Sequence, residues 1–343
     1  MYFPELYFKH ALSSVLSIDS PTGFTKEAVD WLEKEISDLN FKPFKTRNGN
    51  ILTRLSGKTD KNIAISSHVD TVGLVVRSIN KDGSLAFTTI GSPVLATLDG
   101  SSCGVRTRKG ERYNGTIRSN TSSPHVYTNA HTADRTRENM CVILDEHVQN
   151  IEDVRRLGIL PGDYIFFSSE SRIFRNDFIK IRFLDNKLGV AIMLSTLHAF
   201  REENIVPINN VEFIFSAWEE LGFGLSSLSE NVEEVLSVDM GCVGDYLTCT
   251  EKQVSICAGD TLGPMDYEMT SRLIEIAERK RLNYAVDVYP HYDSDISTAR
   301  VSGRDFRGAL IGPGVSASHG YERSSIAACE NTFKLLCGYL LED

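Results

Sequence analysis

The sequence predicts an α/β fold in which both ends of the chain build one domain and a β-rich insertion interrupts it. Short apolar, β-branched strands alternate with helical patterns near the N-terminus and again beyond residue 179. Between residues 72 and 168 the chain is instead rich in Gly, Ser, Thr and Asn, with short alternating runs. Several predicted strands also run directly into His, Asp or Glu, at the sheet edge where α/β folds hold their sites.

The first part of the predicted catalytic domain is residues 1–71. A helical stretch opens it, and the sequence Ser-Pro-Thr-Gly at residues 20–23 breaks the chain. Thr25 can cap a second helix, in which apolar residues recur at helical spacing, namely Ala28, Leu32, Ile36 and Leu39. Residues 63–67 are apolar and β-branched, so they predict a strand that ends at His68 and Asp70.

The predicted insertion is residues 72–168. Residues 84–88 alternate as a strand does, and helical periodicity returns only at residues 151–157. The densest polar stretch, residues 118–138, contains His125, His131 and several Arg, and it predicts a surface loop. The insertion is therefore expected to be mostly β.

The second part of the catalytic domain is residues 169–343. Residues 211–215 and 235–238 predict buried strands, and residues 189–200 and 268–280 predict helices. A C-terminal helix follows, with one apolar face made by Ile326, Cys329, Phe333, Leu336 and Leu340. With the 343 residues of the chain, these segments are enough for two nested domains.

Charge and cysteine content exclude several classes of protein. The net charge of −10 argues against a partner that is duplex DNA or an anionic membrane, because phosphates would be repelled. The seven cysteines contain no C-x-x-C pair, so neither a disulfide framework nor a zinc ribbon is indicated. The N-terminus lacks a signal-peptide pattern and no stretch of about 18 uncharged apolar residues occurs. A cytoplasmic protein is expected.

Five places put potential metal ligands at or just after a predicted strand. They are His68 with Asp70, Asp185, Glu219 with Glu220, Asp239, and His319. Each alone has a common alternative: Asp185 could cap the helix that begins near Leu188, and Asp239 could form a turn. Together, without a Cys, they are a mixed N/O set that suits Zn²⁺, Co²⁺ or Mn²⁺.

The adjacent acids Glu219 and Glu220 favour a metal centre. Two neighbouring carboxylates in a turn would repel one another unless a cation lies between them. A metal held by one of them, with the other acting on water, gives both a role. Two ions about 3.5–4 Å apart need a bridging carboxylate, for which Asp185 is the candidate, and together they would lower the pKa of a shared water to about 7. Asp70 can accept from His68 and orient its ring.

These motifs jointly resemble the glutamyl/tetrahedral aminopeptidase family of dinuclear metallopeptidases, along nearly the whole chain from about residue 18 to 340. The segments that carry the resemblance are SHVDTVG at residues 67–73, LDNKLG at 184–189, WEELG at 218–222, SVD at 237–239, SD at 294–295 and SHGYER at 318–323. The resemblance implies a zinc-peptidase-like (phosphorylase/hydrolase-like) mixed sheet sandwiched by helices. It also implies an inserted β-barrel or PDZ-like dimerisation domain.

The same resemblance implies an activity and a set of roles. Members remove N-terminal residues from peptides with zinc or cobalt, and commonly assemble as dimers that build a tetrahedral dodecamer; some relatives carry cellulase or endoglucanase names. His68 and Asp239 would bind one metal, Glu220 and His319 the other, with Asp185 bridging. Glu219 would be the general base, with Asp70 beside it as the second catalytic residue.

Two places depart from the family pattern. The usual pair of acids and an Arg after the bridging position is here Asp185-Asn186-Lys187, and the last ligand continues as His319-Gly320-Tyr321. These changes affect the expected substrate pocket more than the metal site. The loop at residues 118–139 also lies in the insertion and is a candidate feature of this branch.

A metal-dependent aminopeptidase acting on a peptide or another small amino-acid-derived substrate is the leading hypothesis, and two alternatives stay open. A related dinuclear deacylase or carboxypeptidase would need a cation for the substrate carboxylate, for which Arg300, Arg304 and Arg323 are available. A shell-forming or binding protein with a degenerate metal site is the non-enzyme alternative. A glycosidase fits poorly, because its two acids must lie about 5–9.5 Å apart across a sugar.

Overall fold

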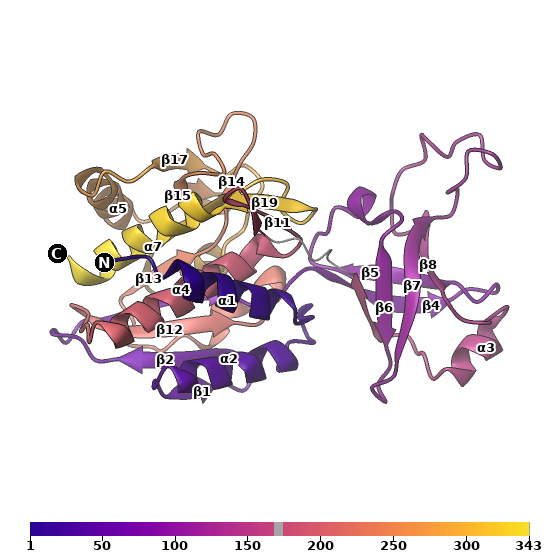
Figure 1. Cartoon of the computed structure of the whole chain (residues 1–343), viewed down its shortest axis with the longest axis horizontal. Helices are drawn as coiled ribbons and strands as arrows, with labels where there is room; N and C mark the ends of the chain where they lie inside the picture. Colours follow the sequence, from indigo (N-terminus) through magenta and orange to yellow (C-terminus); the bar gives the residue numbers. More distant parts are fainter. Residues whose placement is uncertain (168–173, 343) are drawn as a thin grey trace. The chain divides into compact units, whose positions relative to one another are not determined.

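The computed structural model describes residues 1–167 and 174–342 and divides them into two compact units (Figure 1). The described part of the first unit is residues 1–71, 174–318 and 322–342, and that of the second is residues 72–167 and 319–321. The predicted end of the insertion, residue 168, lies outside the described residues.

The first unit is built on a mixed, ten-stranded sheet, as the sequence analysis expected. Its central strands β12, β3, β13 and β18 are parallel, whereas β2 runs antiparallel to β12 and β15 runs antiparallel to β18. In spatial order the strands are β1 (Pro43–Lys45), β2 (Ile51–Leu55), β12 (Asn210–Ser216), β3 (Asn62–His68), β13 (Glu234–Val238), β18 (Arg307–Val315), β15 (Val254–Asp260) and β16 (Gly263–Pro264). Two more join it, β14 (Gly241–Cys242) on β18 and β17 (Tyr284–Val288) on β15.

Helices and short 3₁₀ turns cover both faces of this sheet. Successive side chains of a strand point to opposite faces, so Ile63 and Ile65 of β3 join one apolar cluster and Ala64 joins the other. The first cluster includes residues of five helices, α1 (Glu5–Leu16), α2 (Lys26–Asp38), α4 (Leu184–Glu202), α5 (Tyr267–Arg279) and α7 (Ile326–Leu341). The second includes residues of α6 (Asp295–Val301) and η3 (Gly224–Ser227). The predicted sandwich is confirmed.

The predicted helices are present with small differences at their ends. Thr25 stands at the N-cap position of α2 but makes no capping hydrogen bond with its side chain. The helix predicted over residues 189–200 lies inside α4, whose residues Asp185 and Asn186 have non-helical backbone angles. A small three-stranded sheet also belongs to this unit, formed by β10 (Phe174–Arg175), β11 (Phe178–Ile181) and β19 (Glu322–Ser325).

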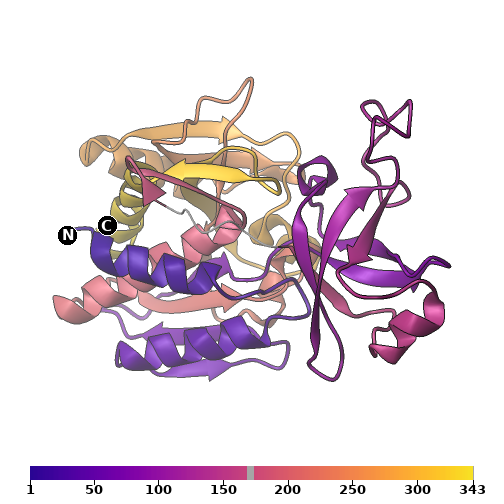
Figure 2. The same cartoon turned by 45° about the vertical axis from the view of Figure 1, so that its right-hand side comes forward.

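The second unit is a closed six-stranded barrel, which confirms the expected β-barrel (Figure 2). The strands follow one another around it as β4 (Gly73–Ile79), β5 (Leu85–Ile90), β8 (Met140–Leu144), β7 (Arg112–Ser119), β6 (Ser102–Arg106) and β9 (Tyr164–Phe167). The turn η1 (Leu95–Leu98) and the helix α3 (Ile151–Arg156) lie outside the barrel strands, and residues 120–139 form a loop without helix or strand. Closure leaves none of the barrel strands with an unpaired edge.

Residues 319–321 belong to this second unit, although the sequence analysis placed them in the catalytic part. The reason is a backbone contact with the segment after β5, since the amide of Val94 donates to the carbonyl oxygen of His319 at 3.0 Å.

Two further structural facts bear on the sequence analysis. All seven cysteines are unpaired, and six of them are buried. Across residues 1–167 and 174–342, no helix combines the length and apolar character that crossing a bilayer requires.

A close backbone approach at Gly312 gives the first prediction. A Cβ atom at this position would lie 1.3 Å from the carbonyl oxygen of Asp239, in the segment that continues β13 beside β18. Gly312→Ala therefore has to push the two strands apart, and we expect a loss of about 3 kcal/mol in the free energy of unfolding. Urea unfolding measures it. Gly244→Ala is the control, because nothing lies within 4 Å of its Cβ; equal stability of the two variants would contradict the prediction.

Candidate metal centre

The candidate ligands meet because three neighbouring strands are parallel. His68 is the last residue of β3, Glu219 and Glu220 follow β12 in the short turn η2 (Glu219–Leu221), and Asp239 follows β13. Strands β12 and β13 flank β3 on either side and run parallel to it. Their carboxyl ends therefore lie at one edge of the sheet, which is where the sequence analysis expected the site.

The imidazole of His68 lies at the centre of the cluster. Its Nε2 atom is 3.2 Å from Asp185 Oδ1, 3.6 Å from Glu219 Oε2 and 3.7 Å from Asp239 Oδ2. Two sets of three residues each bring their ligand atoms within 4.8 Å of one another. They are His68, Asp185 and Glu220 in one set and His68, Glu219 and Asp239 in the other. Four predicted metal ligands and the predicted base thus gather in one place.

His319, the fifth predicted ligand, is not among these sets in the part of the chain that the structure describes. Its Nδ1 atom is 3.1 Å from the carbonyl oxygen of Ser92, within the barrel unit. A ligand role for His319 stays a prediction.

Asp70 fixes the orientation of the His68 ring through its backbone. The Nδ1 atom of His68 is 2.9 Å from the carbonyl oxygen of Asp70, which can only accept, so Nδ1 carries the proton. Nε2 is then the ring atom that faces the carboxylates, and once it has lost its own proton it can bind a metal. The carboxylate that the sequence analysis assigned to this contact is farther away, with Oδ1 3.6 Å from Nδ1.

The Asp70 carboxylate instead holds the turn that carries both glutamates. It is fully buried and accepts from the amides of Glu219 at 3.2 Å and Glu220 at 3.3 Å, and from Thr22 Oγ1 at 2.7 Å. Thr22 was not singled out from the sequence, because nothing local connects it to a turn almost 200 residues away. Asp70 therefore positions the imidazole with one group and the two carboxylates with another.

Asn186, one of the departures from the family pattern, anchors the segment of Asp185. Its Nδ2 donates to Ser67 Oγ at 3.0 Å and to the carbonyl oxygen of Val238 at 2.9 Å, while its Oδ1 accepts from the amide of Gly189 at 3.2 Å. Asn186 thus caps the continuing helix, the role that one interpretation had given to Asp185. The Asp185 carboxylate is left to face His68.

Lys187, the second departure, is buried and donates to the carbonyl oxygen of Ile18 at 2.6 Å. Burial lowers its pKa to about 7, against the opposing charge of Asp19. Its ammonium group thus contacts the N-terminal segment, and it lies 5.6 Å from the centroid of the Phe183 ring.

The site's electrostatics require a counterion. Burial raises the pKa of Glu219 well above its usual value; His68 opposes this, and the charges of Asp295 and Asp239 add to it. Burial lowers the pKa of His68, but the charges of Glu219 and Asp239 outweigh burial and raise it well above 6.5. A divalent cation would relieve the repulsion among these carboxylates, and their N/O donor set fits Zn²⁺, Co²⁺ or Mn²⁺.

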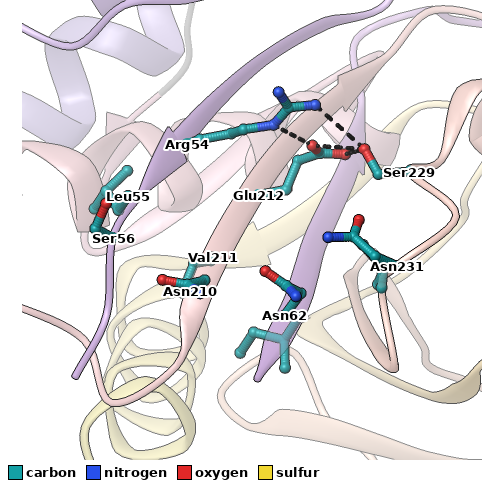
Figure 3. Close-up of a pocket in the computed structure, with 11 residues that line it drawn as sticks. Arg54, Leu55, Ser56, Asn62, Asn210, Val211, Glu212, Ser229 and Asn231 are labelled. Carbon is teal, nitrogen blue, oxygen red and sulfur yellow. Dashed lines mark hydrogen bonds and ion pairs between the residues drawn. The ribbon is translucent and has the colours of Figure 1, made fainter. Parts of the chain in front are cut away.

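A separate pocket of about 410 Å³ opens at the opposite edge of the sheet (Figure 3). It is lined by Asn62 and Asn210, which begin the parallel strands β3 and β12. Its buried acid Glu212 already accepts from Arg54 Nε at 2.7 Å and from Ser229 Oγ. At about 3.3 Å per residue, the length of β3 separates this pocket from His68 by roughly 20 Å.

Comparisons with known proteins agree on one family. The sequence profile described as M42 glutamyl aminopeptidase matches residues 49–335. A Bacillus subtilis (strain 168) protein named "Putative aminopeptidase YhfE" is 37% identical over 331 residues, 96% of each chain.

Solved structures of low sequence identity show the same fold. The TET aminopeptidase of Thaumarchaeota archaeon SCGC AB-539-E09 superposes with a TM-score of 0.87 at 18% identity, covering 97% of this chain and 96% of that one. The TET1 peptidase of Pyrococcus horikoshii, whose title says that it can assemble into a tetrahedron or a large octahedral shell, gives 0.84 at 19% identity, covering 98% and 100%.

The raised pKa of His68 predicts that metal binding releases protons. In the metal-free protein the imidazole holds a proton at neutral pH, and this proton must leave before Nε2 can bind a metal. Affinity for Zn²⁺ should therefore rise with pH between 6 and 8, by up to about tenfold per unit for each proton released. Calorimetry in buffers of different ionisation enthalpy counts the protons. An affinity that does not change with pH would contradict the prediction.

Proposed function

The chain belongs to the M42 glutamyl aminopeptidase family and is a peptidase, and from this premise we propose that it removes N-terminal residues from peptides at a centre of two divalent metal ions. The observation that carries the proposal is the arrangement around His68. Its Nε2 atom faces three carboxylates at 3.2–3.7 Å, while the carbonyl of Asp70 fixes the proton on Nδ1. This is the arrangement of a histidine prepared to bind a metal.

We assign the ligands as the family resemblance implies. His68 and Asp239 would hold one ion and Glu220 and His319 the other, and Asp185 would be the ligand that they share. Zinc or cobalt suits this donor set best, and manganese is the third candidate. When bound, the two ions would polarise the scissile carbonyl and lower the pKa of a water molecule to about 7.

Glu219 is the general base in this proposal. Its pKa lies well above the usual value because of burial, which suits a carboxylate that accepts a proton near neutral pH and gives it up again. It takes a proton from the attacking water and passes it to the leaving amine. The hydrogen bonds from the Glu219 and Glu220 amides to Asp70 hold the turn in place, so Asp70 assists by positioning.

The deacylase or carboxypeptidase alternative has less support. The arginines that could hold a substrate carboxylate all contact other groups: Arg300 donates to Gly308 O, Arg304 to Ser226 O, and Arg323 lies 3.5 Å from Glu251. A substrate with a free N-terminal ammonium group suits a carboxylate-rich site better.

Assembly and location complete the proposal. We propose a homo-oligomer, from a dimer up to a tetrahedral dodecamer, in which the barrel unit forms the dimer contact. The support is a matched structure whose title describes assembly into a tetrahedron or an octahedral shell. The cytoplasm is the proposed location, because seven unpaired cysteines suit a reducing compartment.

Glu219→Gln tests the catalytic assignment. We expect turnover to fall by about 10²–10⁴-fold, because the amide cannot carry the proton, while bound metal is retained. Aminoacyl and N-acyl-aminoacyl chromogenic substrates, assayed after chelation and metal restoration, measure activity and separate the two hydrolase hypotheses. Mass spectrometry of the elements measures metal.

Two matched variants serve as controls for this experiment. Glu220→Gln removes a proposed ligand and should lose metal as well as activity, whereas Glu230→Gln changes an exposed acid and should change neither. An active Glu219→Gln enzyme would contradict the assignment of the base. Cleavage of N-acyl substrates alone would contradict the aminopeptidase proposal.

The oligomer has its own prediction. Light scattering after size-exclusion chromatography should give a mass that is a multiple of the 38.2 kDa chain, up to twelve chains. If the barrel units made no contact with one another, the protein would have the mass of a single chain. A monomeric mass at micromolar concentration would therefore contradict the proposed assembly.

A further inference from the structure

Tyr292 has a buried hydroxyl group that the proposed chemistry does not yet use. Its Oη atom is inaccessible to solvent and has no hydrogen-bond partner among the described residues. Buried phenol hydroxyls almost always have a partner, so an unpaired one points to a group that arrives only with a ligand or substrate. Tyr292 lies in the loop that joins β17 to α6.

The ring of Tyr292 is held firmly in place. It packs edge-on against Tyr289, with ring centroids 5.2 Å apart and planes at 81°. Its amide donates to Thr261 Oγ1 at 2.8 Å, and the amide of Thr261 donates to its carbonyl oxygen at 3.0 Å. The hydroxyl position is therefore set before any ligand binds.

The first residue of α6, which directly follows this loop, contacts residues next to the metal-ligand cluster. Asp295, three residues beyond Tyr292, accepts from Ser216 Oγ at 3.0 Å, and Ser216 is the strand partner of His68. Its carboxylate also lies so close to Gly224 that a Cβ there would be 2.2 Å from Oδ1. Ser216 and Gly224 flank the Glu219–Glu220 turn in the sequence, so the start of α6 contacts the chain just before and just after that turn.

The charges of the site's carboxylates also act on this hydroxyl. Burial raises the pKa of Tyr292 well above 10, and the charges of Asp239, Glu219 and Asp185 raise it further. The hydroxyl therefore keeps its proton at neutral pH and can act only as a neutral donor toward an anion. It stands where most neighbouring groups only accept hydrogen bonds.

We propose that Tyr292 is a catalytic residue that donates a hydrogen bond to the carbonyl oxygen of the scissile peptide as negative charge develops on it. This inference rests on the proposed aminopeptidase function. The water oxygen forms a bond to the carbonyl carbon, and the C=O electron pair moves onto the carbonyl oxygen. Tyr292 keeps its proton throughout. When the C–N bond breaks, the electron pair returns, and Glu219 supplies the proton that the leaving amine takes up.

A donor of this kind contributes most where charge appears only in the transition state. The hydroxyl is already oriented and desolvated, so it does not reorganise when the oxyanion forms. Removal of one such donor from an oxyanion hole typically lowers kcat by about 10²–10³-fold. The same hydrogen bond stabilises the uncharged carbonyl oxygen of the bound substrate less than it stabilises the oxyanion. KM should therefore change little.

Tyr292→Phe is the decisive variant because it removes only the hydroxyl. With the substrate that the wild-type enzyme cleaves best, we expect kcat to fall about 100-fold and KM to change less than about threefold. Calorimetry on metal-loaded protein adds a readout besides activity. A phosphinic pseudo-dipeptide, whose anionic oxygen mimics the developing charge, should bind about 10–100-fold more weakly to the variant. The product amino acid should bind equally to both proteins.

Tyr289→Phe is the matched control. It removes a neighbouring buried hydroxyl that already has a partner, Ser255 Oγ at 2.6 Å, so kcat and inhibitor affinity should stay close to wild type. The metal content of all three proteins is measured in parallel. A Tyr292→Phe protein that loses metal, or binds the phosphinate as the wild type does, overturns the inference, since the hydroxyl would then only support a ligand such as Asp239.

Failure of the inference and failure of the proposed function are distinguishable. Wild-type protein that releases no N-terminal residue with any of the three metals overturns the function. Active wild-type protein together with an equally active Tyr292→Phe variant overturns the role of Tyr292 alone.

Discussion

The concentration of carboxylates around the buried His68 imidazole is the constraint on which the rest of the catalytic unit depends. Asp185, Glu219 and Asp239 all approach one nitrogen atom to within 3.7 Å, where little solvent reaches them. Such a cluster is unfavourable by itself, because burial and mutual repulsion both oppose the charged forms. It persists because the fold holds it in place and because divalent cations would neutralise it.

The carboxylate cluster is held in place by polar groups that have no assigned contact with a substrate. Asp70 connects the end of β3 to the Glu219–Glu220 turn, and Asn186 connects the start of α4 to Ser67 and to the carbonyl of Val238. Each of these hydrogen bonds is buried or partly buried, so each partner would lose a costly interaction if the other moved. The ligand geometry is therefore built into the packing of strand ends, which explains why residues next to the ligands matter as much as the ligands.

The charged groups at the two ends of the sheet are in different states. At the carboxyl ends of β3, β12 and β13 the acids are crowded and the pKa values of Glu219 and His68 are raised, as expected of a functional site. At the amino ends, Glu212 is already paired with Arg54, so the pocket there has its buried charge satisfied. The state of the charged groups therefore distinguishes the two edges.

The sequence by itself determined the family, the mixed α/β sheet, the inserted barrel and the set of acids and histidines, because strand periodicity and motif order are local properties of the chain. Only the tertiary structure decided how side chains meet: that the Asp70 carbonyl rather than its carboxylate lies nearest to His68, that Thr22 supports Asp70, and that the Tyr292 hydroxyl is buried with no hydrogen-bond partner among the described residues. Apart from the contact between His68 and Asp70, these arrangements join segments tens to hundreds of residues apart. They depend on the register of strands and the packing of loops, and no local pattern encodes either.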